Sequence, residues 1–211
     1  DGGWTLEMID PHNPCAGSTN WAASTHPNGG TPGKKNSVDG LNTDNTPPQL
    51  KRAYTTNNLT IMLLYDEPVD SVSGATFSHY TIDGGLSIAS ASVPAPLFNT
   101  VQLTLSTPML PNTVYTITAS GISDCKGNAA TLSGTVRTGL PEDPASGEWV
   151  INEILFNPRP NGDDYVEFFN NSDKILDASK LYIANRNSSG AVSNAKVLAS
   201  SPFLVFPGDY I

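Results

Sequence analysis

The sequence predicts an all-β protein, and three observations lead to that fold class. Charged residues make up 15% of the 211 residues and hydrophobic residues 38%. The chain carries 18 Gly and 17 Pro, a composition that suits short strands joined by turns. Several segments alternate large apolar with polar side chains, and none carries a sustained helical stripe. We therefore expect a Greek-key β-sandwich together with a second, sandwich-like β module.

The charge balance excludes some partners. The formal net charge is −9, from 20 acidic against 11 basic residues spread along the whole length. Such a surface repels nucleic acid and anionic lipid, so no nucleic-acid partner is expected. No apolar run approaches the roughly 18 residues of a membrane span. The chain begins without an initiator Met or a signal peptide, and we expect it to be a piece of a longer protein.

The central unit is predicted to be a sandwich over residues 46–139. Pro47-Pro48 favours an extended entry, because the residue before a proline is pushed toward the β region. Alternation predicts strands at 59–63, 101–105 and 115–119, and four more are expected at 49–54, 77–82, 86–93 and 131–137, a spacing typical of sandwiches. The predicted core comprises Leu59, Ile61, Leu63, Tyr80, Val101, Leu103, Tyr115, Ile117 and Val136.

Two further regions flank this unit. Residues 4–9 alternate like a half-buried strand, and an ordered loop anchored by Trp21 follows as far as residue 38. Residues 140–147 combine two prolines with acidic and small residues and are predicted to be a linker. In the last module, residues 148–211, strands are expected at 149–156, 164–169, 180–185, 195–199 and 203–206.

Two carboxylates of the last module could form a paired acid and base. Glu153 and Glu167 lie in neighbouring predicted strands, and such pairs serve general acid–base chemistry. No histidine or nucleophile accompanies them in the sequence. The structural alternative is that both are bound by the backbone or by Arg159 or Lys180, because buried carboxylates are normally satisfied. We favour this alternative.

The three histidines do not indicate a site. His12, His26 and His79 are isolated, with neither metal-ligand spacing nor a nucleophile nearby in the sequence. Surface positions in turns are the better interpretation. With no candidate catalytic residue, the sequence predicts that the fragment is not an enzyme.

Acidic turns are the candidates for a metal. Asp66, Glu67 and Asp70 gather at one predicted strand end and Asp163-Asp164 at another, and calcium prefers such oxygen-rich loops. Neither fits an EF-hand, and acidic turns are common in β proteins. The expectation is therefore no cofactor, with weakly bound calcium as the alternative.

The two cysteines leave two alternatives open. Cys15 and Cys125 are too far apart for a CxxC redox or zinc motif. They form either one disulfide or two free thiols, because the sequence does not place their Cα atoms within bridging reach.

Both ends of the chain resemble parts of the lamin tail family. Residues 150–154 (VINEI), 164–170 (DYVEFFN) and 176–183 (LDASKLYI) resemble the opening strands of a lamin tail domain. Residues 3–9 (GWTLEMI), 20–24 (NWAAS) and 30–36 (GTPGKKN) resemble its closing segment. The resemblance implies that 147–211 is the N-terminal part of one such module and 1–38 the C-terminal part of another.

The central unit is similar to bacterial Ig-like domains. The similarity lies in residues 46–48 (TPP), 65–70 (YDEPVD) and 124–128 (DCKGN), although Tyr65 and Asp66 stand where Phe-Ser is commoner. The resemblance implies an Ig-like sandwich in a secreted or cell-surface bacterial protein. Because thiols oxidise outside the cytoplasm, we then predict that Cys15 and Cys125 are bonded.

The expected function follows from these resemblances. We expect a non-catalytic structural or adhesive module, acting as a spacer or a protein-interaction scaffold. The alternative is an accessory substrate- or carbohydrate-binding module of a secreted hydrolase such as a nuclease or phosphoesterase, with Trp21 as an aromatic platform. Expected partners are other modules of the same protein or an extracellular protein or glycan. The two ends are expected to complement each other, within one chain or between two as a strand-exchanged homodimer.

Overall fold

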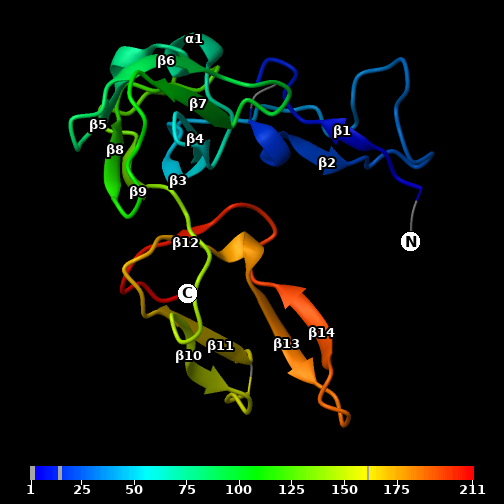
Figure 1. The fold of residues 1–211 in the computed structure, drawn as a ribbon. Helices are drawn as coiled ribbons and strands as arrows, with labels where there is room; N and C mark the ends of the chain where they lie inside the picture. Colours follow the sequence, from blue (N-terminus) through cyan, green and yellow to red (C-terminus); the bar gives the residue numbers. More distant parts are fainter. Residues whose placement is uncertain (1–2, 14–15, 161) are drawn as a thin grey trace.

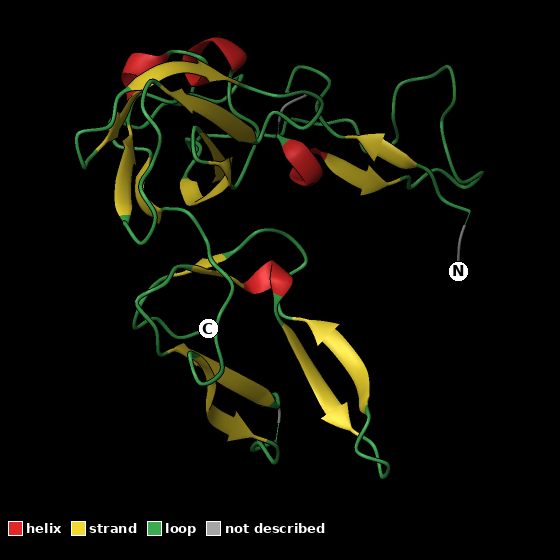
Figure 2. Ribbon diagram, in the orientation of Figure 1, coloured by secondary structure: helices red, strands yellow, loops and turns green. Residues whose placement is uncertain are grey.

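The structure is a computed structural model that describes residues 3–13, 16–160 and 162–211. Strands dominate it, which confirms the all-β prediction. An N-terminal module lies beside a central sandwich, and a C-terminal module lies below that sandwich (Figures 1 and 2). No helix among the described residues is long and apolar enough to cross a membrane. The helical elements described are α1 (Ser71–Gly74), η1 (Gly17–Asn20), η2 (Phe77–His79) and η3 (Ala178–Lys180).

The central unit is a two-sheet sandwich. One sheet has the order β3-β4-β7-β6 and the other β5-β8-β9, with every neighbouring pair antiparallel. This is the four-plus-three strand order of a constant-type immunoglobulin domain. The strands are β3 (Leu50–Asn57), β4 (Thr60–Tyr65), β5 (Tyr80–Ile82), β6 (Ile88–Ser92), β7 (Thr100–Leu105), β8 (Tyr115–Ala119) and β9 (Gly134–Thr138).

The core of the sandwich follows the predicted alternation with one error. The structure buries Ile61, Leu63, Tyr80, Val101, Leu103, Tyr115 and Ile117, and Val136 packs against them partly buried. Leu59 is 38% exposed and does not belong to the core. It lies in the turn before β4, where its N–H donates to Oδ1 of Asn57, so the alternation begins two residues later.

The N-terminal module contains a small hairpin whose faces are reversed relative to the prediction. Its strands, β1 (Leu6–Met8) and β2 (Trp21–Ala23), pair antiparallel. Leu6 is 70% exposed, whereas Glu7 is 5% exposed. The half-buried strand was expected to bury its apolar side. Thr31 and Ser37 cover the inner side of β1 and donate hydrogen bonds from a hydroxyl and an N–H group. The Glu7 carboxylate, which accepts these bonds, is therefore the side chain that is buried there.

The C-terminal module consists of three antiparallel strand pairs. Two long hairpins diverge from a short pair that adjoins the sandwich (Figure 1). The predicted strands are present, and β12 was missed because a two-residue strand leaves no alternation to detect. The pairs are β10 (Trp149–Leu155) with β11 (Tyr165–Asn170), β12 (Leu176–Asp177) with β15 (Leu204–Val205), and β13 (Tyr182–Arg186) with β14 (Val192–Val197).

The segment predicted to be a linker, residues 140–147, is docked at its start. Pro141 forms a parallel bridge with Ile175, and the N–H of Glu142 donates to the Ile175 carbonyl at 2.8 Å. Leu140 packs against the sandwich core. The chain therefore enters the C-terminal module along a fixed path.

The two ends of one chain do not complement each other in this structure. β1 pairs with β2, and no hydrogen bond or ion pair joins the described residues of 3–43 to those of 147–211. The form of the complementation prediction that operates within one chain is therefore not observed, and the form between two chains stays a prediction.

Candidate functional site

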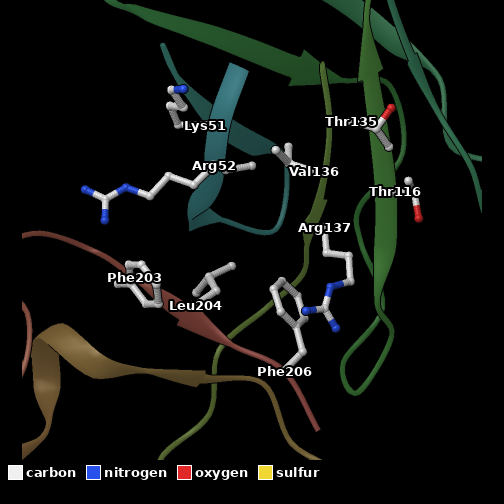
Figure 3. A pocket seen from close by; sticks show the side chains of 10 residues that line it. Lys51, Arg52, Thr116, Thr135, Val136, Arg137, Phe203, Leu204 and Phe206 are labelled. Atoms are coloured by element: carbon white, nitrogen blue, oxygen red, sulfur yellow. The ribbon is translucent and has the colours of Figure 1, made fainter. Parts of the chain in front are cut away.

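Polar and aromatic contacts join the sandwich to the C-terminal module (Figure 3). Nη2 of Arg137 lies 2.6 Å from Oδ2 of Asp209, and its guanidinium carbon lies 4.3 Å from the centre of the Phe206 ring. On the other side, Nη2 of Arg52 donates to Oγ of Ser201 at 2.8 Å. Two arginines of the sandwich thus hold the far module through polar contacts and ring stacking.

The pleat of the sandwich strands places these arginines. In β3 and β9, Ala53 and Val136 contribute to the core, and their neighbours Arg52 and Arg137 therefore point outward. β15 crosses this outer surface (Figure 3). Beneath the arginines, Tyr54 packs against a cluster of Ile175, Leu204 and Phe206. The junction combines apolar burial with oriented charges and is suited to holding two modules in a fixed orientation.

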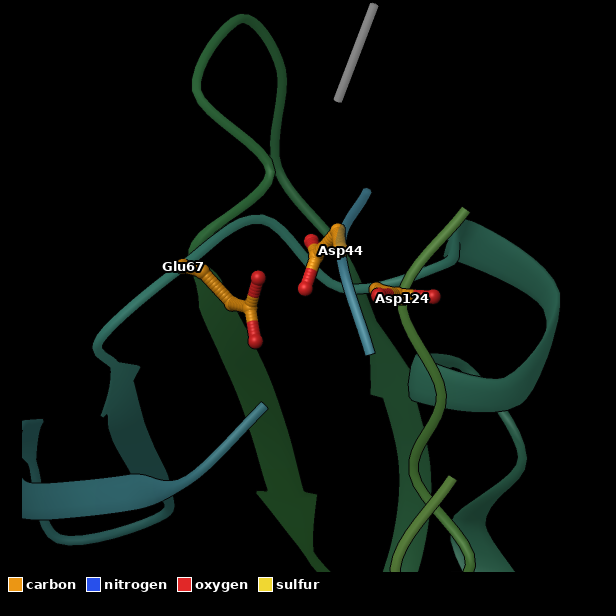
Figure 4. Close-up of side chains that lie close together, drawn as sticks. All are labelled: Asp44, Glu67 and Asp124. Atoms are coloured by element: carbon orange, nitrogen blue, oxygen red, sulfur yellow. The ribbon is translucent and has the colours of Figure 1, made fainter. Parts of the chain in front are cut away.

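A second feature is a cluster of three carboxylates beside the sandwich (Figure 4). Oxygen atoms of Asp44, Glu67 and Asp124 lie within 4.8 Å of one another, although the residues come from three separate segments. Asp124 is held by its own turn, because its Oδ1 accepts from the N–H groups of Lys126 and Asn128, both at 2.9 Å. The amide of Asn128 also donates to the Asp44 carbonyl, which ties the third segment to the cluster.

Like charges make this cluster costly when it is fully ionised. Burial, followed by the charges of Asp44, Asp124 and Asp66, raises the pKa of Glu67 to about 7. The loss of one negative charge at the cluster, or the approach of a cation, would relieve the repulsion. Oxygen ligands of this kind are those that a hard cation such as calcium accepts.

The residues predicted for calcium meet in this cluster only in part. Glu67 belongs to it, whereas Asp66 binds Lys51 at 3.1 Å and Asp70 caps α1 by accepting from Val72 and Ser73. The other predicted pair, Asp163-Asp164, belongs to no three-ligand group among the described residues. Sequence reasoning missed Asp44 and Asp124, and the turn at 124–128 was the available signal for the latter.

Glu153 and Glu167 lie directly opposite each other on β10 and β11. Oε1 of Glu153 accepts from the Tyr165 hydroxyl at 2.6 Å, and Oε1 of Glu167 accepts from the amide of Asn152. Both carboxylates therefore have structural partners, as favoured, but those partners are not the predicted Arg159 or Lys180. No histidine among the described residues hydrogen-bonds to either carboxylate.

The histidines take local roles in turns and loops. His12 lies 3.6 Å from Asp10, and Nδ1 of His26 accepts from the N–H of Asn28 at 3.2 Å. Nδ1 of His79 lies 3.0 Å from the Ser73 carbonyl. Within the described part of the chain these contacts bring no histidine to a nucleophile or to a three-ligand metal group.

The predicted disulfide involves one residue outside the described part of the chain. Cys15 lies outside the described residues, and Cys125 is not a free thiol. The bond between Cys15 and Cys125 stays a prediction.

Comparison with known proteins gives limited similarity. No protein-family model and no curated protein matches the chain. Among solved structures, the S-layer protein SbsC is 19% identical over 71% of this chain, with a TM-score of 0.42, and the chain spans 19% of the length of that structure. The N-terminal part of the bacterial S-layer protein SbsC is 14% identical, with a TM-score of 0.42, over 78% of this chain and 45% of that one. The lamin tail and Ig-like resemblances stay predictions.

Proposed function

We propose that this chain is a non-catalytic structural module of a secreted or cell-surface bacterial protein, acting as a spacer and interaction scaffold. The observation that carries the proposal is the junction through which Arg52 and Arg137 bind the C-terminal module. A spacer has to keep its parts in a fixed orientation, and a junction with directional contacts does so better than a flexible linker.

Several contacts of different kinds support this rigidity. The charge contact of Arg137, the docked start of the linker at Pro141 and the apolar packing of Tyr54 lie at separate points of the junction. Rotation about any one of them would break the others. The two modules are therefore expected to move as one body.

The state of Cys125 supports the surface location. Cys125 is not a free thiol, which suits an oxidising compartment. The net charge of −9 disfavours binding to nucleic acid in any compartment.

Residual dipolar couplings in dilute solution test the proposal. Couplings from the sandwich and from the C-terminal module should fit one alignment tensor in the unmodified chain, and two tensors after combined Arg52→Ala and Arg137→Ala. Arg186→Ala is the matched control, because Arg186 donates only locally to the Gly190 carbonyl in the described structure. Two tensors in the unmodified chain would refute the spacer function.

A second candidate is an accessory module that binds carbohydrate. It is favoured by two exposed tryptophans of the N-terminal module, Trp4 at 53% and Trp21 at 45% exposed. Aromatic faces with a polar rim suit sugar rings. Soluble polysaccharides that change the tryptophan fluorescence of the chain, but not that of Trp21→Ala, would favour this candidate over the spacer.

A further inference from the structure

The β1–β2 hairpin buries a charged face and exposes an apolar one. Oε1 of Glu7 accepts from the Thr31 hydroxyl at 2.6 Å, and Oε2 accepts from the N–H and hydroxyl of Ser37, both at 2.7 Å. Burial raises the pKa of Glu7, but hydrogen bonds from Thr31, Ser37 and Ser24 outweigh it and lower that pKa to about 2. This side of the hairpin is therefore fully occupied by polar contacts.

The opposite side of the same hairpin lacks a cover. The register pairs Leu6 with Ala23 and Met8 with Trp21, which places these four side chains on one face. Leu6 is 70% exposed and Trp21 45% exposed. We call Leu6, Met8, Trp21 and Ala23 the N face. A soluble antiparallel pair normally turns its apolar side inward, so the reversal indicates that a partner covers the N face.

A second apolar face, exposed on its β10 side, lies on the β10–β11 hairpin. Ile151 pairs with Phe168 and Ile154 with Val166, and the bulge between the two pairs keeps all four on one side. Ile151 is 53% exposed and Ile154 54% exposed, whereas Phe168 is covered by the stacked ring of Trp149 at 5.4 Å. We call Ile151, Ile154, Val166 and Phe168 the C face.

The charges around the two faces are complementary. Lys34 lines the same hollow as Leu6, Met8 and Trp21, and it forms no ion pair within the described residues, whereas Lys35 pairs with Asp39. Asp163 and Asp164 lie next to the turn of the C-face hairpin, where Arg159 is the single base, whereas Glu153 and Glu167 pair with each other on the opposite side of the hairpin. Opposite charges of this kind select and orient a partner.

The two faces do not meet within one chain. The N face lies on the module beside the sandwich and the C face on the module below it (Figure 1). The two faces are different surfaces on different modules. A contact between the N face of one copy and the C face of another is therefore heterologous, and each copy can bind a further one instead of forming a closed dimer.

We propose that the N face of one copy packs on the C face of a second copy, so that the chain assembles head to tail. This inference deepens the proposed structural function by naming the partner as another copy of the chain. The apolar faces supply the contact area, and Lys34 approaches Asp163 and Asp164 at the turn of its neighbour's hairpin.

Two variants that each retain one face test the arrangement. The N-face variant carries Leu6→Glu and Trp21→Glu, and the C-face variant carries Ile151→Glu and Ile154→Glu. All four side chains are at least 45% exposed, so the variants should fold, and circular dichroism melts check that they do. Leu110→Glu is the matched control, because Leu110 is 63% exposed on the sandwich and belongs to neither face.

Sedimentation equilibrium over a range of concentrations gives the readout. The unmodified chain and the control should grow beyond two copies, and each face variant alone should keep the 22.3 kDa mass of one chain. An equimolar mixture of the two variants should reach two copies and stop, because each variant supplies the face that the other lacks.

Each other outcome overturns the proposal. An unmodified chain that remains a single copy lacks the contact, and a face variant that still pairs with itself shows a symmetric contact instead. Loss of assembly in Leu110→Glu would mean non-specific association. Residual dipolar couplings of the N-face variant show whether the proposed spacer function fails together with the assembly. If these couplings fit one alignment tensor, the spacer function holds even when the chain does not assemble.

Discussion

The guanidinium of Arg137 lies 2.6 Å from the carboxylate of Asp209, and these two residues belong to different modules. Arg137 is 48% exposed at its side chain and Asp209 29%, so solvent screens much of their attraction. The same guanidinium also lies over the Phe206 ring. The pair therefore contributes more to the orientation of the modules than to the total stability.

Arg137→Ala should lower the free energy of unfolding by about 1 kcal/mol, the sum of a screened ion pair and one stacked cation. Urea denaturation measures the change. Arg137→Lys keeps the charge but loses the planar stack, and should recover part of the loss. A change below the error of the method would show that the contacts of Arg137 do not stabilise the junction.

Ile117→Ala should destabilise the sandwich by about 2–5 kcal/mol, because it opens a cavity at a fully buried position. Leu59→Ala is the control from the same predicted core, and its 38% exposure predicts a much smaller loss. Thermal and urea unfolding both report the difference. Equal losses at the two positions would contradict the assignment of Leu59 to a surface turn.

Glu67→Gln should stabilise the protein at pH 8 and have little effect at pH 4. The pKa of Glu67 is about 7 when folded against 4.5 unfolded, so the folded state binds the proton more tightly. Stability from this group is present at low pH and is lost as the pH rises from about 4.5 through 7. Melting temperatures across this range check the sign.

Asp39→Asn is the control for that prediction, because Asp39 pairs with Lys35, does not contribute to the pKa of Glu67 and should not gain stability on neutralisation. Melts with calcium chloride and with EDTA at pH 8 test the cation alternative. Stabilisation by calcium that disappears in Glu67→Gln would place the ion at the cluster. An equal gain at pH 4 and pH 8 would contradict the pKa argument.

Cys15 and Cys125 should yield no free thiol when the unfolded, unreduced chain is titrated. The loop between them is long, so the bond would contribute on the order of 4 kcal/mol by limiting the unfolded chain. A melt under reducing conditions should therefore begin at a lower temperature. Two titratable thiols per chain would refute the bond.

The sandwich was predictable because the positions of its apolar residues indicate which face of each strand is buried. In β7, the buried Val101 and Leu103 alternate with the polar Gln102 and Thr104, and two faces of this kind close on each other in a sandwich. The same period at β1 predicted a strand but the wrong inner face. Alternation separates the two faces of a strand but does not indicate which face is buried. Here the segment that covers one face of β1 is polar, because it carries Thr31 and Ser37.

The carboxylate cluster was less predictable, because its members are distant in sequence. Asp44 and Asp124 are joined by the amide of Asn128, a contact that only the folded turn creates. Glu67 was named from its acidic neighbours, of which Asp66 turned out to serve Lys51. Local composition thus identified Glu67 and did not identify the other two carboxylates of the cluster.

The hydrogen bonds to Glu7 mean that the side chains that hold the β1–β2 hairpin in place are not its exposed apolar side chains. In most antiparallel sheets the apolar side chains hold the fold by packing on the core, and the polar side chains face solvent. Here Thr31 and Ser37 hold the hairpin through the carboxylate. Substitutions at Leu6 and Trp21 should therefore change what the hairpin contacts without unfolding it.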